Sequence, residues 1–185
     1  RVLQFVPLRQ DNKLYAVVNG KYWRVMVFIP NAITKQAVNA ESSRAAGLAF
    51  GQFQSMLADL PVQFGETIKD FHNMEFRLKQ LRDVLANDPT GRSSEPRVKE
   101  MLAIIDDRAE EMCKAERMGR EGILPKRVCH CDTKVNNMMF DDQDNVLCVI
   151  DLDTVMPNFI FSDYGDFLRT GANFVAEDCP DMDKV

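Results

Sequence analysis

The sequence has no apolar run that approaches the roughly 20 residues a helix needs to span a bilayer. It has no cluster of Lys and Arg, and its formal net charge is −5 with a pI of about 5.1. These features argue against binding to nucleic acid or to an anionic membrane. No signal-peptide pattern, internal repeat or low-complexity tract is present. With 185 residues and 45% hydrophobic content, the chain can form one sizeable core, and we expect a cytoplasmic protein.

Cysteine is present in an odd number, in a composition typical of cytosolic enzymes. The five residues are Cys113, Cys129, Cys131, Cys148 and Cys179. We interpret them as reduced thiols. Cys129 and Cys131 flank His130, but zinc cysteines normally have about two to four residues between them, and no second cysteine pair is present. A zinc site formed through sulfur is therefore not expected.

The densest polar pattern lies between residues 128 and 153. Within it, His130, Asp132 and Asn137 follow the spacing H-x-D-x-x-x-x-N. A phosphoryl-transfer site is often assembled in this way, with one carboxylate that orients the attacking hydroxyl and an amide that holds Mg²⁺. The motif predicts that Asp132 accepts or orients the proton of a substrate hydroxyl. His130 is either a scaffold that fixes the loop, which we favour, or an acid–base group that competes with Asp132.

A short apolar hairpin follows this motif. Residues 138–140 and 146–150 are rich in β-forming side chains and flank an acidic turn at 141–145. The turn has neither the Gly nor the Glu of a calcium loop, so we interpret it as a solvated hairpin tip. The second strand leads to Asp151 and Asp153, which in an extended segment point the same way.

Three oxygen-bearing side chains are thereby predicted to converge. Asn137 offers a neutral oxygen and Asp151 an anionic one, and both suit a hard cation such as Mg²⁺. Asp153 is either a further metal ligand or an outer anchor of the site. Because the transition state of phosphoryl transfer is highly charged, such a site acts mainly by positioning groups and neutralising charge.

Two segments carry a family resemblance. HCDTKVNNMMF and CVIDLDTVMP resemble the aminoglycoside phosphotransferase and choline kinase-like superfamily, which shares the protein-kinase catalytic core. Within that superfamily, VIDLDTVMP and SDYGDFLRTGAN are similar to the N-acetylhexosamine 1-kinases. Upstream, NGKYWRVMVFIPNA, AFGQFQSMLADLP and TIKDFHNMEFRLKQL are similar to the same group. The resemblance covers nearly the whole chain and is densest at residues 128–173.

The resemblance implies an α+β, protein kinase-like fold with a mostly helical C-terminal lobe. Residues 1–31 would be a remnant of the N-terminal lobe, with a β-hairpin and the hinge. Residues 32–185 would form the catalytic lobe, incomplete at its C-terminus. Phe28 and Ile29 would then lie near the base of a bound nucleotide, although they also fit a half-buried strand without a ligand.

Four further residues are candidates for the acceptor side of the site. His72 and Arg77 could line a sugar site, as the resemblance implies, or His72 could simply hydrogen-bond to a neighbouring carbonyl. Asp166 and Arg169 stand three residues apart on a predicted helix. They could support the metal-binding loop and approach the acceptor sugar, or they could form an ordinary surface ion pair.

The sequence departs from the family in three ways. Cys131 stands where such kinases usually have a small or amide residue, and Pro157 is followed by Asn158 where a Gly is usual. The chain also lacks a Gly-rich phosphate loop and a Lys on a preceding strand paired with a helix Glu, parts that in the family precede the segments matched here. We therefore expect an interior fragment that is inactive by itself.

Local patterns predict the elements around the motif. Asn19-Gly20 is a strong signal for a two-residue hairpin turn. Apolar spacing predicts helices that Pro, Gly, Ser and Asp delimit. The predicted elements are a hairpin over 13–29, helices over 41–60, from Asn73 to about 88 and from about Ser94 to Gly119, and a helix that Ser162 or Asp163 caps and that ends at Gly171.

Taken together, the sequence predicts an ATP-dependent, Mg²⁺-dependent small-molecule kinase. The resemblance indicates that the parent protein transfers the γ-phosphoryl group to the anomeric hydroxyl of an N-acetylhexosamine. Other acceptors in the superfamily are other sugars, aminoglycosides, choline and homoserine. A hypothesis of a different class is a non-catalytic remnant that binds a nucleotide or a partner. The expected partners are a sugar and ATP, without nucleic acid or membrane.

Overall fold

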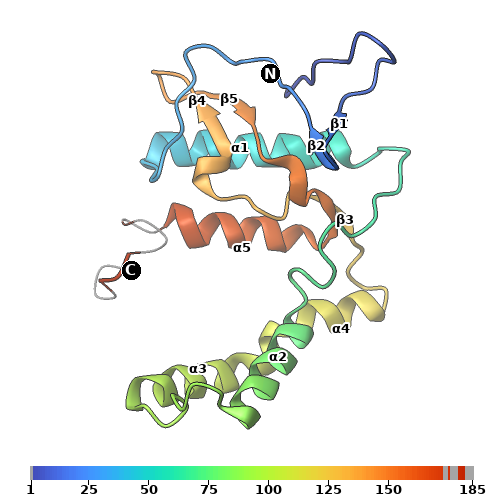
Figure 1. Cartoon of the computed structure of the whole chain (residues 1–185). Helices are drawn as coiled ribbons and strands as arrows, with labels where there is room; N and C mark the ends of the chain where they lie inside the picture. The colour runs from blue at the N-terminus through green and yellow to red at the C-terminus, as the bar shows by residue number, and fades with distance from the viewer. Residues whose placement is uncertain (1, 173–174, 176–178, 182–185) are drawn as a thin grey trace. The chain divides into compact units, whose positions relative to one another are not determined.

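Short antiparallel strand pairs and helices make up the α+β fold (Figure 1). The structure, a computed structural model, describes residues 2–172, 175 and 179–181. The chain divides into two compact units, each built from separate segments. The first unit comprises Arg1–Pro61, Asp132–Asp153 and Asp163–Val185, and the second comprises Val62–Cys131 and Thr154–Ser162. The predicted lobe boundary at residue 31 stays a prediction.

The predicted N-terminal hairpin of the first unit is present but shorter than residues 13–29. Strand β1 (Ala16–Val18) pairs antiparallel with β2 (Lys21–Trp23). The intervening Asn19 and Gly20 have φ of 52° and 73°, as a type I′ turn requires. Beyond β2 the chain pairs elsewhere, since Met26 forms a bridge with Phe5. A hydrogen-bonding partner from before residue 13 thus ends the hairpin early.

Helix α1 (Ala40–Leu57) packs against the second hairpin of this unit, β4 (Met138–Phe140) and β5 (Val146–Val149) (Figure 1). The four buried side chains at the centre of this contact are Ala46, Phe50, Met138 and Phe140. Burying one such large side chain contributes about 1.5–3 kcal/mol to the free energy of folding. The hairpin that leads to Asp151 is therefore fixed on a helix.

Helix α1 does not reach the predicted end at residue 60. Met56 and Leu60 are 64% and 38% exposed, whereas Phe50 is buried. The helix ends at Leu57, so Leu60 does not continue its face. Among the described residues, Gly47 and Gly51 of this helix have no close neighbour, because a Cβ built at either position meets no atom within 4 Å.

The acidic turn between β4 and β5 is ordered by its own side chains. Oδ1 of Asp141 accepts the backbone N–H groups of Gln143 and Asn145, both at 2.9 Å. Asp144 has a φ of 64°, a left-handed conformation that Asp tolerates. The predicted strand–turn–strand pattern is confirmed, with a register irregularity at Met139 and Phe140.

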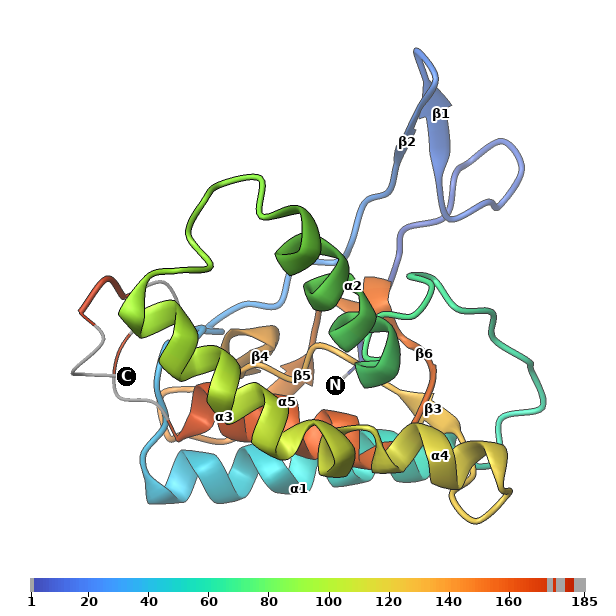
Figure 2. The same cartoon turned by 90° about the horizontal axis from the view of Figure 1, so that it is seen from below.

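The second unit contains α2 (Met74–Asn87), α3 (Pro96–Met112) and α4 (Lys114–Arg120) (Figure 2). Helix α2 agrees with its prediction, and Oδ1 of Asn73 caps it by accepting the N–H of Phe76 at 3.0 Å. The single helix predicted from about Ser94 to Gly119 was wrong in one respect. It breaks at Cys113 into α3 and α4.

Strands β3 (Arg127–Cys129) and β6 (Met156–Asn158) pair antiparallel in the same unit. Strand β6 was not among the predicted elements. Proline is tolerated here because, among the described strands, β6 pairs with β3 alone, so its other edge forms no ladder that would need a backbone N–H. The pairing sets Pro157 opposite Val128, two residues before His130.

Helix α5 (Ile160–Gly171) begins earlier than predicted. The proposed caps Ser162 and Asp163 lie within its first turn, and Asp163 is only 3% exposed. Its carboxylate accepts a hydrogen bond from Nε2 of Gln54 on α1 at 2.8 Å, so the side chain turns inward. Within the described ranges, no helix combines the length and apolar character that crossing a membrane demands.

Candidate active site

The loop that carries the H-x-D-x-x-x-x-N motif is tied to α5. Oγ1 of Thr133 donates to the backbone oxygen of Asp163 at 2.5 Å, and the N–H of Val135 donates to Oγ1 of Thr170 at 3.3 Å. The loop then closes in a short 3₁₀ turn over Val135–Asn137. Because these bonds reach two turns of one helix, the backbone around Asp132 has a defined course.

Asp132 and Asn137 are in direct contact. Nδ2 of Asn137 donates to the backbone oxygen of Asp132 at 2.8 Å and to its Oδ2 at 2.7 Å. Nζ of Lys134 lies 3.1 Å from the same Oδ2. The Asp132 side chain is 20% exposed, so its carboxylate is held yet reachable from solvent. A carboxylate oriented in this way can accept a proton from an approaching hydroxyl.

The hairpin ladder brings Asp151 towards Asn137. Met138 pairs with Val149, and the N–H of Ile150 donates to the backbone oxygen of Asn137 at 2.9 Å. Asp151 therefore follows directly after the residue bonded to Asn137. The predicted extended segment was wrong, because Asp151 has a φ of 60° and Leu152–Thr154 forms a 3₁₀ turn.

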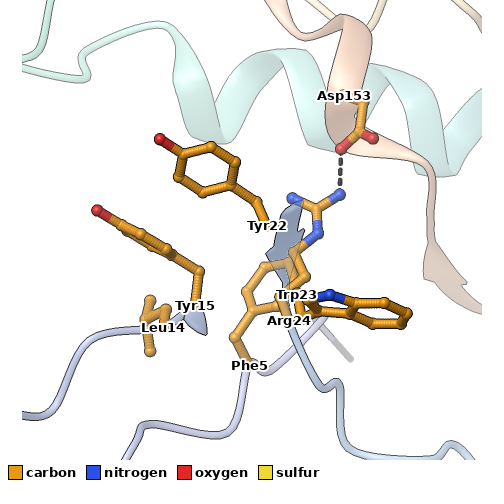
Figure 3. Close-up of a pocket in the computed structure, with 7 residues that line it drawn as sticks. All are labelled: Phe5, Leu14, Tyr15, Tyr22, Trp23, Arg24 and Asp153. Carbon is orange, nitrogen blue, oxygen red and sulfur yellow. Dashed lines mark hydrogen bonds and ion pairs between the residues drawn. The ribbon is translucent and has the colours of Figure 1, made fainter. Parts of the chain in front are cut away.

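Asp153 has a partner that the sequence pattern did not suggest. Its Oδ1 forms an ion pair with Nη2 of Arg24, which stands just beyond β2 (Figure 3). The Arg24 guanidinium also lies over the ring of Phe5, 5.0 Å from its centroid. These groups belong to a cavity of about 510 Å³ lined by Phe5, Leu14, Tyr15, Tyr22, Trp23, Arg24 and Asp153.

The donor set at Asn137 and Asp151 fits a hard divalent cation. The amide nitrogen of Asn137 is engaged by Asp132, which leaves its side-chain oxygen as a ligand. Oδ1 of Asn136, the preceding residue in the chain, is buried without a hydrogen-bond partner among the described residues. The described parts of the chain hold no group of three His, Cys, Asp or Glu suited to a metal. Asn137 and Asp151 stay the predicted ligands.

Predicted site residues of the second unit have structural contacts. His130 is fully buried, and its backbone oxygen accepts Oγ1 of Thr154 at 2.8 Å. Arg77 donates from Nε and Nη2 to the backbone oxygen of Phe71, at 3.2 and 2.9 Å. Nδ1 of His72 lies 3.3 Å from Nδ2 of Asn158. Sugar contact by His72 and Arg77 stays a prediction.

The other predicted residues lie in the first unit. Phe28 is 84% exposed and Ile29 is half-buried, so neither packs in the core. Asp166 and Arg169 form an ion pair at 2.7 Å on α5. Oδ2 of Asp166 also lies 3.4 Å from Oγ1 of Thr133, which links this pair to the catalytic loop.

A second, small cavity in the second unit is lined by polar groups. Glu66, Asp70, His72, Glu116 and Lys126 contribute to it. Lys126 pairs with Glu66 at 3.3 Å. Burial raises the pKa of Glu116, and the nearby Lys126 opposes this rise.

Comparison with known proteins settles the family. The sequence model described as the phosphotransferase enzyme family matches residues 5–182. The chain belongs to the phosphotransferase enzyme family. Two solved structures are similar to it, and both are aminoglycoside phosphotransferases. The chain spans about half the length of each of them, 52% and 49%.

The first is an aminoglycoside phosphotransferase from Alicyclobacillus acidocaldarius, with a TM-score of 0.61 and 16% sequence identity over 91% of this chain. The second is APH(3'')-Id from Streptomyces rimosus in complex with ADP and streptomycin, with a TM-score of 0.42 and 22% identity over 72% of this chain. The first similarity shows that the kinase-like α+β fold predicted from the sequence is present.

Several contacts of this phosphotransferase-family site escaped sequence analysis. Lys134 was detectable in principle, because it is a cation two residues after the motif Asp. The buried Asp163 and its partner Gln54 carry no local signal, since 109 positions separate them. The same holds for Arg24 and Asp153, which are 129 positions apart.

Proposed function

We propose that the intact protein is a cytoplasmic enzyme that transfers the γ-phosphoryl group of ATP to a hydroxyl of a small molecule. The observation that carries this proposal is the contact between Asp132 and Asn137, at 2.7 Å. The hydrogen bond from Ile150 to Asn137 adds Asp151 to the same end of the hairpin. A carboxylate, an amide and a second carboxylate in this order are the parts that phosphoryl transfer needs.

Asp132 would handle the proton of the acceptor. Asn137 and Lys134 hold its Oδ2, so the carboxylate has one orientation. In that orientation it aligns the acceptor hydroxyl and takes up its proton as the new O–P bond forms and the bond to the leaving phosphate breaks. The Lys134 ammonium adds a positive charge where negative charge accumulates on the transferred group.

Mg²⁺ would neutralise phosphate charge at this site. Asn137 would hold the ion through its side-chain oxygen, and Asp151 would hold it through its carboxylate. The ion pair between Asp153 and Arg24 favours an anchoring role for Asp153 over direct ligation, because its charge already has a partner. The carboxylate would then hold the turn that presents Asp151.

The proposed acceptor is the anomeric hydroxyl of an N-acetylhexosamine. Its support is the resemblance of residues 149–157 and 162–173 to N-acetylhexosamine 1-kinases. Full-length protein would be incubated with ATP, Mg²⁺ and a panel of free sugars, aminoglycosides and amino alcohols, with ADP release as the readout. Turnover with N-acetylhexosamines is expected to exceed that with every other class. Turnover confined to aminoglycosides or amino alcohols would contradict the proposed sugar acceptor, whereas the proposed kinase activity would still hold.

Asp132→Asn tests the chemistry directly. In the full-length protein we expect kcat to fall by about 10²–10⁴-fold, because a neutral amide cannot take up the hydroxyl proton. Acceptor affinity, measured by calorimetry, should stay within about threefold because the side-chain shape is kept. Asp107→Asn is the matched control, since Asp107 is an exposed Asp on α3. Unchanged turnover in Asp132→Asn would count decisively against the assignment.

A further inference from the structure

Asn158, the last residue of β6, uses every hydrogen-bonding position of its side-chain amide. Its Oδ1 accepts the N–H of Phe159 at 2.8 Å and Oγ of Ser162 at 3.4 Å. Its Nδ2 donates to Sγ of Cys131 at 3.4 Å and faces Nδ1 of His72 at 3.3 Å. The side chain is only 7% exposed. A primary amide has two donors and two acceptor lone pairs, so this one is fully engaged.

These contacts also define which way the amide points. Because Oδ1 accepts a backbone N–H, Nδ2 must face Cys131 and His72. The ring nitrogen Nδ1 of His72 lies against this amide nitrogen. The His72 ring is stacked on Phe71 with 4.5 Å between ring centroids, so its orientation is fixed as well.

Cys131, the residue to which Asn158 donates, has an unusual backbone conformation. Cys131 has a φ of 65°, a region that side-chain-bearing residues rarely adopt, and it is 1% exposed. Such a conformation persists only where surrounding contacts enforce it. Thr154 holds the preceding residue through the backbone oxygen of His130, and Asn158 holds Cys131 itself. The next residue along the chain is Asp132.

We propose that Asn158 is a positioning residue for the catalytic loop. It anchors the Cys131 side chain and keeps the left-handed backbone at the residue that directly precedes Asp132. The catalytic consequence rests on the proposed function, whereas the anchoring does not.

The anchoring can be measured without a substrate. We would compare iodoacetamide alkylation of the wild type and Asn158→Leu under native conditions. Trypsin cuts after Arg127 and Lys134, and fragment ions of that one peptide separate Cys129 from Cys131. Loss of the amide should raise the alkylation rate of Cys131 by at least about fivefold, because the thiol becomes accessible. The alkylation rate of Cys129, which is fully buried in β3, should change by less than about twofold, because that thiol stays inaccessible.

Cys129 separates anchoring from general loosening. Equal acceleration at Cys129 and Cys131 would mean that Asn158 merely stabilises the β3–β6 pair, and this result would overturn the proposal. An unchanged rate at Cys131 would overturn it as well. Asn87→Leu is the matched control, since Asn87 is an exposed Asn at the end of α2, and both rates should stay at wild-type values there.

Kinetics test the catalytic consequence in the full-length protein. Asn158→Leu should lower kcat by about ten- to a hundredfold with the acceptor KM unchanged, because a displaced carboxylate misaligns the hydroxyl without altering binding. In a Cys131→Gly background the loss should shrink to below about threefold, since Gly adopts a positive φ without an anchor. An equal loss in both backgrounds would overturn positioning through Cys131. Absence of turnover in the wild type would instead count against the proposed function, and the alkylation result would still decide whether Asn158 anchors Cys131.

Discussion

Lys134 adds a charge to the site that the motif by itself does not include. Its ammonium lies 3.1 Å from Oδ2 of Asp132, and both side chains are largely shielded from solvent, with 28% and 20% exposed. A pair at this depth is less screened by salt than a surface pair. Lys134 can therefore act both on the orientation of Asp132 and on the charge of a transferred phosphoryl group.

Lys134→Met tests this role, because methionine keeps the length of the side chain and removes its charge. We expect kcat to fall by about ten- to a hundredfold with little change in the acceptor KM, since the charge acts on the transition state. Steady-state kinetics of the full-length protein provide the measurement. Lys79→Met is the control, because Lys79 is exposed on α2 and pairs only with Asp83. A kcat equal in both variants would contradict a catalytic role for Lys134.

Two residues at the proposed site have left-handed backbones: Cys131, which precedes Asp132, has a φ of 65°, and Asp151, a proposed metal ligand, has a φ of 60°. Neither is a glycine, so no local sequence signal marked them. Asp151 was predicted to lie in an extended segment, where its side chain would point the same way as that of Asp153. Cys131 accepts a hydrogen bond from Asn158, 27 positions away, which is a contact that only the folded chain reveals.

At the scale of elements, the N-terminus of α1 is joined to the tip of the β4–β5 hairpin. Asp144 forms an ion pair with Lys35 and accepts Nδ2 of Asn39 at 2.9 Å. Asn39 caps α1 in turn by accepting the N–H of Ser42 at 2.8 Å. The hydrogen bond from Lys35, followed by that from Asn39, lowers the pKa of Asp144. The acidic turn is thus more than a solvated tip.

This contact predicts a pH dependence of stability. Because the pKa of Asp144 is lower in the folded state, its stabilisation is fully present above the ordinary Asp value of about 3.9 and is lost as the pH falls through the folded-state pKa. Asp144→Asn should therefore lower the denaturant midpoint at about pH 7 and have a shrinking effect towards about pH 3. Asn tolerates the positive φ, so the change isolates the charge.

Asp142→Asn serves as the control for this experiment, since Asp142 is an exposed residue of the same turn. Urea titrations at each pH give the midpoints. A loss of stability in Asp144→Asn that is constant from neutral to acidic pH would contradict an electrostatic contribution and leave only a packing effect.

Two helical glycines differ in the space that is available for a side chain. A Cβ at Gly119 on α4 would lie 2.5 Å from Cζ of Phe159, whereas a Cβ at Gly51 on α1 meets no atom within 4 Å. Gly119→Ala should lower the free energy of unfolding by about 1–3 kcal/mol through overpacking. Gly51→Ala should raise it by about 0.5–1 kcal/mol, because Ala is the better helix former. Chemical denaturation measures both changes, and a neutral Gly119→Ala would show that the Phe159 ring moves freely.

At the scale of the whole molecule, the chain is assembled from segments that are not consecutive. Each of the two units combines early residues with residues from the motif region or just beyond it. Asp132, Asn137, Asp151 and Asp153 all belong to the first unit. The proposed catalytic and metal-binding groups thus belong to the unit whose core is formed by α1 and the β4–β5 hairpin.

Much of this arrangement was predictable from neighbouring residues. The Asn19-Gly20 turn, the Asn73 cap of α2 and the β4–β5 hairpin depend on contacts between residues a few positions apart, and their sequence signals were sufficient. The motif spacing also identified Asp132 and Asn137, whose contact spans five positions. The kinase-like fold followed from the resemblance of these segments.

Only tertiary contacts decided the rest. Strand β6 exists because it has β3 as a partner, Asp153 is neutralised by a residue 129 positions away, and Asn158 meets Cys131 across 27 positions. Local sequence carries information about backbone preference and apolar spacing, and both act over one or two turns. Which charge faces which, and which strained backbone is held in place, depends on side chains that become neighbours after the chain has folded.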